Sequence, residues 1–341
     1  MKLKHWISLL FLLLGSCLIV ISLIIVYSTY PVRNNIDQTI TNYFYSNRSE
    51  LISLIFYIIT HLGEELVYIG IITILYYTWD KSKAYKIMAV VLSSTVVNGL
   101  FKYSFKLERP NQELWYKGAE ETSPGLPSGH TQIATSFWGS FASLIKKWWI
   151  YIVSILLVVL IGFSRIILAV HWFTDVLMGL GLGLLILAFF IEFEDKITNY
   201  VNSLATKYKV ILSFLLFMFL IIPVIVVLPS NLVVDGTQVT PLLDMLKLIT
   251  LFSTATLSYA VEKDLVNFKS KPDTWWKYII RVIIGVVMLF LFYYGLKVLF
   301  NLIIESVAWI GIKPTLDIIR YALLGPVLIL LSPWIMQKLN V

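Results

Sequence analysis

An apolar run near the start of the chain, Trp6–Tyr30 (WISLLFLLLGSCLIVISLIIVYSTY), decides the class of fold. A helix of about 20 apolar residues crosses the hydrocarbon core of a bilayer, and this run is long enough. It exceeds the apolar core of a signal peptide and lacks a small-residue cleavage site, so we expect a retained membrane helix. Of the 341 residues, 58% are hydrophobic and only 14% are charged. The sequence therefore predicts an integral membrane protein.

Further apolar segments continue this pattern to the end of the sequence. Segments long enough to span the membrane lie near residues 6–29, 63–79, 85–103, 129–145, 148–168, 175–193, 209–229, 241–261, 279–304 and 318–338. The stretch 34–59 mixes charged and apolar residues, which is typical of helices that lie at the membrane interface. We predict an all-α, polytopic membrane helical bundle of about ten transmembrane helices.

A polar segment near Phe193 divides this bundle into two predicted parts. Residues 1–195 form a six-helix core, and residues 196–341 form a four-helix C-terminal extension. The extension carries no polar cluster like those described below. We interpret it as a packing or dimerisation surface, with a substrate-shaping module as the alternative.

The distribution of Lys and Arg predicts the orientation in the membrane, because short cytoplasmic loops are rich in these residues. With a cytoplasmic N-terminus, the inner segments hold sixteen cations: Lys2, Lys4, Lys81, Lys83, Lys86, Lys146, Lys147, Lys196, Lys207, Lys209, Lys263, Lys269, Lys271, Lys277, Arg281 and Lys338. The outer segments hold Arg33, Arg48, Lys106, Lys117, Lys313 and Arg320, apart from the motif residues below. We therefore expect both termini to be cytoplasmic.

Cysteine content and charge exclude several classes of function. Cys17 is the single cysteine, so neither an intramolecular disulfide nor a cysteine-based metal site can form. The net charge of +7 is spread over short loops and not gathered on a soluble module, so we predict no nucleic-acid partner. The sequence does not indicate the oligomeric state.

Three short polar patches lie at the ends of predicted spans, all on the outer face. They are Lys102–Pro110 (KYSFKLERP), Pro127–His130 (PSGH) and Ser164–Asp175 (SRIILAVHWFTD). Ionisable residues are costly in a membrane protein, so such a cluster predicts a functional site. We expect the three patches to meet in space.

In the first patch, Lys102 and Arg109 are seven residues apart, which would place both on one face near a helix end that Pro110 terminates. A lysine point charge and a planar guanidinium suit the several oxygens of a phosphate. The alternative is a pair of cations that snorkel to the lipid headgroups.

In the second patch, Ser128, Gly129 and His130 begin a predicted helix. Backbone N–H groups at a helix N-terminus bind anions, and glycine allows a close approach. Ser128 can add a hydroxyl donor, although a simple N-cap would use the same residues.

In the third patch, His171 and Asp175 are four residues apart and would face each other on a helix. A carboxylate bound to one ring nitrogen leaves the other with a lone pair for nucleophilic attack. Arg165 can reach the same anion. An interfacial histidine beside a capping aspartate is the alternative for this pair.

Other chemistries fit these residues less well. Two histidines and one aspartate among three cations would repel a metal ion, so we predict no metal and no cofactor. A nucleophilic Ser128 would lie where an anion-binding helix terminus is more useful. The run GLGLG at 179–183 lies inside a predicted span, so it favours close helix packing over dinucleotide binding.

The three patches, in this order and spacing, resemble the signature of the type 2 phosphatidic acid phosphatase superfamily, which is related to acid phosphatases and haloperoxidases. Every signature position is present: Lys102, Arg109, Pro110, Pro127, Ser128, Gly129, His130, Ser164, Arg165, His171 and Asp175. The resemblance covers the predicted six-helix core, which would be the phosphatase core. The membrane composition excludes the soluble haloperoxidases.

The resemblance implies a metal-independent phosphatase with a phospho-histidine intermediate. His171 would attack phosphorus, Asp175 would orient it, and His130 would protonate the leaving oxygen and then activate water. The phosphoryl oxygens would be held by Lys102, Arg109, Ser128, Gly129 and Arg165.

A site at the outer ends of membrane helices indicates a substrate with its phosphate at the headgroup level and its tail in the bilayer. The resemblance includes phosphatases of several lipids, and the Ile- and Lys-rich composition is typical of a bacterial chain. We therefore expect a lipid phosphate substrate in the cell membrane, either undecaprenyl diphosphate or a glycerophospholipid phosphate such as phosphatidic acid or phosphatidylglycerol phosphate. The active site would be extracytoplasmic.

Two other functions would use the same anion site. A lipid or phosphate transporter would explain the extension and its embedded Lys247 and Lys297. A lipid phosphotransferase would pass the phosphoryl group to an acceptor other than water.

Overall fold

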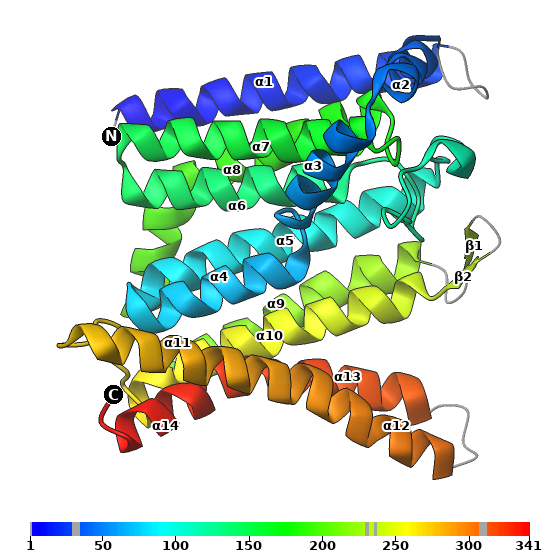
Figure 1. Cartoon of the computed structure of the whole chain (residues 1–341). Coiled ribbons are helices and arrows are strands. Elements are labelled where there is room, and N and C mark those ends of the chain that lie inside the picture. The colour runs from blue at the N-terminus through cyan, green and yellow to red at the C-terminus, as the bar shows by residue number, and fades with distance from the viewer. Residues whose placement is uncertain (1, 29–34, 229–231, 235–236, 307–311) are drawn as a thin grey trace. The chain divides into compact units, whose positions relative to one another are not determined.

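The chain is almost entirely helical in the computed structural model (Figure 1), which describes residues 2–28, 35–228, 232–234, 237–306 and 312–341. The ends of the predicted runs at Thr29, Tyr30 and Pro229, and the predicted outer cation Arg33, lie outside the described residues. The helices are α1 (Lys2–Tyr27), α2 (Asn35–Asn47), α3 (Glu50–His61), α4 (Glu65–Thr78), α5 (Lys81–Phe105), α6 (Gly129–Ile145), α7 (Trp148–Ile167), α8 (Phe173–Ser203), α9 (Thr206–Val227), α10 (Pro241–Leu265), α11 (Trp275–Phe290), α12 (Leu296–Ser306), α13 (Ile312–Pro326) and α14 (Ser332–Lys338).

Shorter elements complete the described chain. A 3-10 turn covers Gln112–Leu114, and π-helical segments at Leu291–Gly295 and Val327–Leu331 join α11 to α12 and α13 to α14. Strands β1 (Leu232–Val234) and β2 (Thr237–Val239) pair antiparallel, with Leu232 opposite Val239 and Val234 opposite Thr237.

The prediction of an all-α, polytopic membrane fold is confirmed. Eight of the ten predicted spans each coincide with one helix, and the spans 279–304 and 318–338 each coincide with two helices joined by a π-helical segment. Within the described residues, seven helices are long and apolar enough to cross a membrane, or eight if the bent pair α3 and α4 is one span. The predicted spans at α6 and α10 fall outside this number. Helix α6 has only 17 residues, and α10 carries charged side chains such as Asp244 and Lys247.

The segment predicted to lie at the membrane interface forms α2 and α3. Helices α3 and α4 together are apolar enough for one span, but they bend by 48° at the break between His61 and Glu65. Gly63 lies in this break, and its importance for the site is described below.

The described chain divides into two compact units. Unit 1 comprises residues 1–68, 93–198 and 232–239, and unit 2 comprises residues 69–92, 199–231 and 240–341. Helix α8 continues to Ser203, beyond the predicted end of its span at residue 193, because the polar segment that follows is itself helical. The functional boundary after residue 195 stays a prediction.

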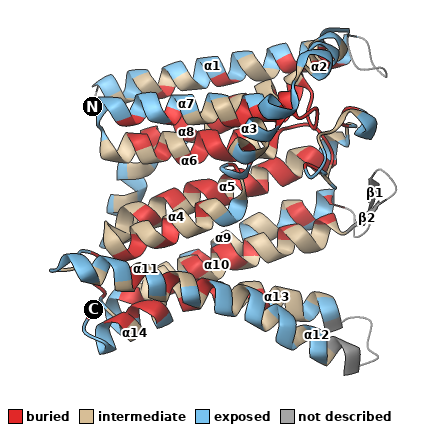
Figure 2. Cartoon of the chain, viewed as in Figure 1, coloured by how far each residue is buried: buried red, intermediate tan, exposed pale blue. Residues whose placement is uncertain are grey.

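In unit 1, glycines of α8 allow close helix packing, as the GLGLG run predicts. A Cβ atom on Gly179 would lie 2.5 Å from the Ser128 carbonyl oxygen, and one on Gly183 would lie 2.6 Å from Cβ of Thr135, so both glycines press against α6. Gly181 faces α1 instead, where a Cβ atom on Gly181 would lie 2.8 Å from the carbonyl oxygen of Gly15. Figure 2 shows buried residues along α6 and α8, where the core of this unit lies.

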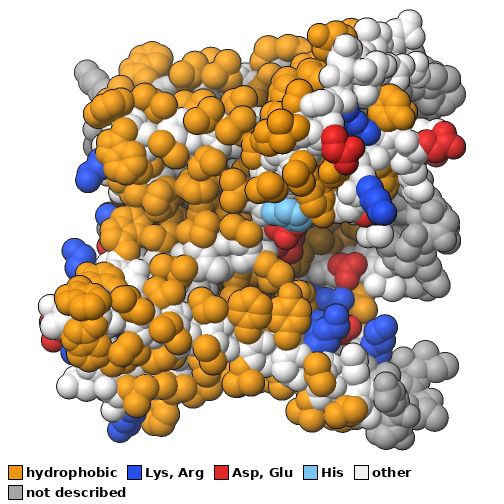
Figure 3. Space-filling model, in the orientation of Figure 1, with side chains coloured by type: hydrophobic (Ala, Val, Ile, Leu, Met, Phe, Trp, Pro, Cys, Tyr) orange, Lys and Arg blue, Asp and Glu red, His pale blue; other side chains and the backbone are white. Residues whose placement is uncertain are grey.

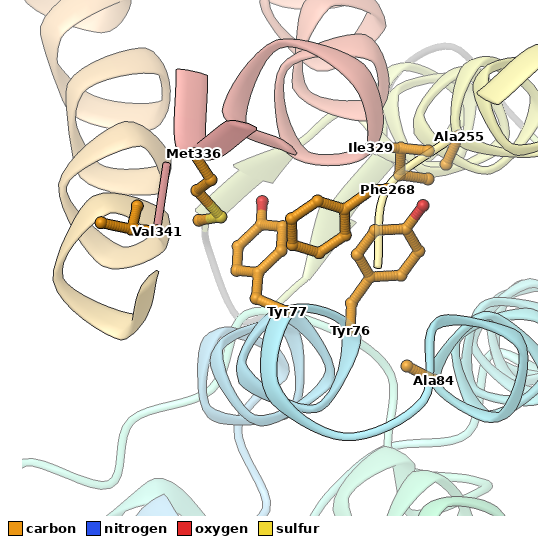
Figure 4. Close-up of a cluster of buried hydrophobic side chains, with 8 residues drawn as sticks. All are labelled: Tyr76, Tyr77, Ala84, Ala255, Phe268, Ile329, Met336 and Val341. Carbon is orange, nitrogen blue, oxygen red and sulfur yellow. The ribbon is translucent and has the colours of Figure 1, made fainter. Parts of the chain in front are cut away.

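In unit 2, a cluster of buried side chains joins α4, α5, α10 and the C-terminal helices. Figure 4 shows its members, Tyr76, Tyr77, Ala84, Ala255, Phe268, Ile329, Met336 and Val341. The Tyr77 hydroxyl donates to the Leu328 carbonyl at 2.6 Å, which satisfies a polar group that would be costly to bury alone. The buried guanidinium of Arg281 donates to the backbone carbonyls of Tyr77, Lys269, Ser270 and Val341. Polar bonds therefore fix the ends of these segments around an aromatic core.

Candidate active site

The signature residues meet at one end of unit 1. Helix α5 ends there, α6 begins there, and the turn from α7 to α8 lies between them, at the end of the unit opposite the N-terminus (Figure 1). The polar side chains of Lys102, Arg109, Arg165, His171 and Asp175 are all buried at this end. The structure thus brings together residues that are up to about 70 positions apart in the sequence.

His171 and Asp175 form the pair expected from their spacing, although α8 begins only at Phe173. Nδ1 of His171 lies 3.1 Å from Oδ2 of Asp175, and the backbone N–H of Trp172 donates to the same carboxylate oxygen at 3.0 Å. When Nδ1 donates to the carboxylate, Nε2 keeps its lone pair, which is the form that can attack an electrophile.

The prediction that Lys102 and Arg109 share a helix face is wrong. Helix α5 ends at Phe105, Lys106 adopts a left-handed φ of 52°, and Arg109 lies in the following loop. The residue before a proline avoids the α region, so Pro110 disfavours a helical Arg109.

Both cations nevertheless reach the same place. The Arg109 guanidinium lies 2.8 Å from Nε2 of His171 and donates to the Val170 carbonyl at 2.7 Å and the Ser123 carbonyl at 2.7 Å. Nζ of Lys102 donates to the Pro124 carbonyl at 2.6 Å and to the Ser123 hydroxyl at 3.2 Å.

A carboxylate that the sequence analysis missed, Glu121, occupies the centre of these cations. Its two oxygens accept from Arg165 and, at 3.4 Å, from Arg109. Arg165 also donates to the Thr60 hydroxyl at 2.6 Å. Glu121 therefore bridges two guanidinium groups in the way that two oxygens of a phosphate would.

A network of polar side chains fixes the start of α6. Ser128 is the N-cap residue, but its hydroxyl pairs with that of Thr131 at 3.0 Å and does not cap the helix. The Ser128 N–H donates to the Asp175 carbonyl at 2.9 Å. Below Gly129, Asn98 donates to Gln132 at 2.9 Å, and Gln132 donates to the Ser94 carbonyl at 2.9 Å. These contacts fix the helix terminus relative to the His171–Asp175 pair.

His130, on the first turn of α6, lies against the break between α3 and α4. A Cβ atom on Gly63 would come within 2.8 Å of Cδ2 of His130 and 2.9 Å of a methyl group of Ile161. Glycine at position 63 thus makes room for the imidazole. The positive charges of Arg165, Arg109 and Lys102 all act on His130, which indicates that it lies near the same cations.

The electrostatic environment favours a neutral nucleophile. Burial, and then the positive charges of Arg109 and Lys102, lower the pKa of His171 well below 6.5. Burial opposes ionisation of Glu121, but the charges of Arg165 and Arg109 outweigh it and lower the pKa of Glu121 below its usual range. At neutral pH the site therefore contains a neutral His171 and a charged Glu121.

Of the two residues that the sequence analysis missed, Glu121 has a signal in the sequence and Asp37 has none. Glu120 and Glu121 form an acidic pair in the loop between two cationic motifs, and charge complementarity points to them. Asp37 precedes the motifs by many residues, yet it caps α8 through the Thr174 N–H at 3.0 Å and the Thr174 hydroxyl at 2.6 Å. No local pattern indicates that contact.

Two family models match this chain. One, described as the PAP2 superfamily, matches residues 83–199, and the other, described as the PAP2 superfamily phosphatase, transmembrane extension, matches residues 246–341. The first match contains all three signature patches, and the second lies within the predicted four-helix extension.

Two named proteins and one solved structure are similar to this chain. Phosphatidylglycerophosphatase B of Bacillus subtilis (strain 168) is 30% identical over 158 residues, which cover 42% of this chain and 75% of that protein. Lipid phosphate phosphatase delta of Arabidopsis thaliana is 30% identical over 104 residues, which cover 27% of this chain and 25% of that protein. The crystal structure of the first transmembrane PAP2 type phosphatidylglycerolphosphate phosphatase from Bacillus subtilis aligns with 57% of this chain and 97% of its own, at 27% identity and a TM-score of 0.43. The resemblance predicted from the signature is confirmed, and the chain belongs to the PAP2 superfamily.

Proposed function

We propose that this protein is a metal-independent membrane phosphatase that hydrolyses a lipid phosphate monoester or diphosphate through a phospho-histidine intermediate. The observation that carries the proposal is the buried His171, which has Asp175 at 3.1 Å from Nδ1 and Arg109 at 2.8 Å from Nε2. Membership in the PAP2 superfamily supports phosphatase chemistry, and the membrane-spanning helices support a lipid substrate.

In the first step, Nε2 of His171 attacks phosphorus, the bond from phosphorus to the leaving oxygen breaks, and His130 gives that oxygen a proton. The Nδ1–H of His171 stays bound to Asp175, which stabilises the positive charge that develops on the ring. In the second step, His130 takes a proton from water, whose oxygen attacks phosphorus and breaks the P–N bond. Phosphate leaves, and neutral His171 is restored.

Charge stabilisation comes from the protein itself. Lys102, Arg109 and Arg165 would bind the equatorial oxygens, together with the Ser128 hydroxyl and the backbone N–H of Gly129. Two contacts of the free protein must break first. Glu121 must release the two guanidinium groups, and Arg109 must release Nε2 of His171.

We further propose an extracytoplasmic site in the cell membrane with cytoplasmic termini, and a phosphatase core over residues 1–195. The excess of Lys and Arg in the predicted inner segments supports this orientation. The match to a transmembrane extension model supports a separate C-terminal part.

A phosphate-release assay tests the function on the purified full-length protein. Candidate substrates are phosphatidic acid, phosphatidylglycerol phosphate and undecaprenyl diphosphate in mixed micelles, each with and without EDTA. We expect release that survives EDTA and is abolished by His171→Ala, whereas His5→Ala, on an exposed histidine at the far end of unit 1, retains it. Loss of activity with EDTA alone would refute the metal-free mechanism, and lipid uptake into liposomes without any release would identify a transporter.

A further inference from the structure

The break between α3 and α4 carries a hydrogen-bonded pair of side chains, His61 and Glu64, that the reaction steps above do not use. Nδ1 of His61 binds Oε1 of Glu64, and the two side chains are 46% and 44% exposed. Hydrophobic side chains cover most of the face seen in Figure 3, and ionisable side chains are few among them. Ionisable groups at an apolar surface are costly and mark functional positions.

The break is joined to the site by contacts on both sides of the pair. Thr60 accepts from Arg165, and Gly63 packs against the ring of His130. The ring of Tyr57 meets the ring of His61 edge-on at 4.7 Å. His61 follows Thr60 in the sequence and Glu64 follows Gly63, so both side chains of the pair adjoin the residues that contact Arg165 and His130.

These contacts define which part of a substrate the pair would meet. In the proposed function, on which this inference rests, His130 protonates the leaving oxygen. The leaving group then lies on the His130 side of the phosphorus, whereas the phosphoryl oxygens lie toward Arg109 and Arg165. The atoms beyond the leaving oxygen come to the break between α3 and α4.

We propose that His61 and Glu64 form a leaving-group subsite that selects a phosphate monoester whose alcohol carries a free hydroxyl over a lipid diphosphate. A carboxylate accepts a hydrogen bond from a hydroxyl, and His61 orients the carboxylate. A diphosphate has a phosphate as its leaving group, and Glu64 repels that negative charge. The Glu64 carboxylate thus favours binding of a hydroxyl-bearing phosphate monoester and disfavours binding of a lipid diphosphate.

The experiment compares two pairs of substrates on the purified full-length protein. The first pair is lysophosphatidic acid, which has a free 2-hydroxyl, and its 2-deoxy analogue. The second pair is lysophosphatidic acid and farnesyl diphosphate. The quantity measured is the ratio of kcat/KM within each pair. The control is Glu192→Gln, because Glu192 pairs with His5 at 3.1 Å at the far end of unit 1.

We expect wild type to prefer the hydroxyl-bearing substrate by about tenfold, the low end for a hydrogen bond to a charged group, because the Glu64 side chain is 44% exposed. Glu64→Ala brings that ratio close to one, and Glu64→Gln, which removes only the charge, shifts the second ratio toward the diphosphate by about tenfold. Glu192→Gln leaves both ratios as in wild type. If Glu64→Ala does not fold, Glu64→Gln and His61→Gln preserve side-chain volume and carry both measurements.

Active Glu64 variants whose two ratios stay within twofold of wild type would overturn the subsite and leave the phosphatase intact. A wild-type protein that releases no phosphate from any of these lipids would overturn the proposed function and the subsite with it.

Discussion

Glu121 holds the phosphate-binding cations in the free protein, so its charge should oppose anion binding. We consider Glu121→Gln, which keeps the size of the side chain and removes the charge. In the free protein the substitution leaves Arg165 and Arg109 without their anionic partner. In the complex with phosphate, Glu121 has been displaced, so the substitution changes little there. The free energy lost by the free protein therefore appears as tighter binding of the anion.

The structure sets the size of this effect. A hydrogen bond to a charged group contributes about 1.5–3 kcal/mol, and Glu121 makes one such bond to Arg165 and a longer one to Arg109. The Glu121 side chain is 22% exposed and the Arg109 contact is 3.4 Å, so water screens part of the interaction. We expect about 2 kcal/mol in total, which corresponds to ~30-fold in a binding constant.

Two measurements on the full-length protein test this expectation. The inhibition constant of inorganic phosphate should fall by ~30-fold, and the Tm of the free protein should fall but recover when phosphate is added. Glu120→Gln is the matched control, because Glu120 is adjacent and its carboxylate accepts from the Gly118 N–H at 3.0 Å, away from the cations. An inhibition constant that stays the same or rises in Glu121→Gln, with normal behaviour of Glu120→Gln, would refute the displacement of Glu121.

Two further expectations concern pH and packing. Burial, and then the charges of Arg109 and Lys102, lower the pKa of His171 well below 6.5. As the pH falls through 6.5, His171 therefore binds a proton in the unfolded chain but not in the folded protein. Stability should fall as pH drops below 6.5, and NMR of the free protein should show no His171 titration near that pH. Gly179→Ala would place a Cβ 2.5 Å from the Ser128 carbonyl, so we expect about 1–3 kcal/mol of destabilisation and reduced kcat. Gly70→Ala, with nothing within 4 Å of its Cβ, should fold and turn over normally, and equal effects of both substitutions would contradict this account.

The helices could be predicted because hydrophobic length is a local property of the sequence. The run at 6–29 became α1 and the run at 148–168 became α7 with only small shifts at their ends. The bend between α3 and α4 was not predicted, because it depends on Gly63 packing against His130 and Ile161, which are distant in the sequence. From local hydropathy we assigned residues 34–59 to the membrane interface and residues 63–79 to a span. In the structure, α3 from the first segment and α4 from the second form one bent pair.

The site could be predicted in part because its signature fixes residue types and order. His171 and Asp175 were placed together from their spacing, and that contact forms in the turn before α8. The common helix face of Lys102 and Arg109 was wrong because α5 ends before Arg109, and loop geometry leaves no periodic pattern in a sequence. Glu121 was missed for the same reason, since its position depends on the fold of the loop that carries it.

The geometry of the site depends on backbone groups more than on contacts among the signature side chains. Asp175 is held by the Trp172 N–H, and its own carbonyl holds the Ser128 N–H, so a single residue links the nucleophile to the anion-binding helix terminus. Arg109 is aimed by the carbonyls of Val170 and Ser123. These bonds persist whichever anion occupies the cations, because none of them involves a charged partner that substrate must displace. The loop carrying Glu121 can therefore yield to a substrate while the His171–Asp175 pair keeps its place.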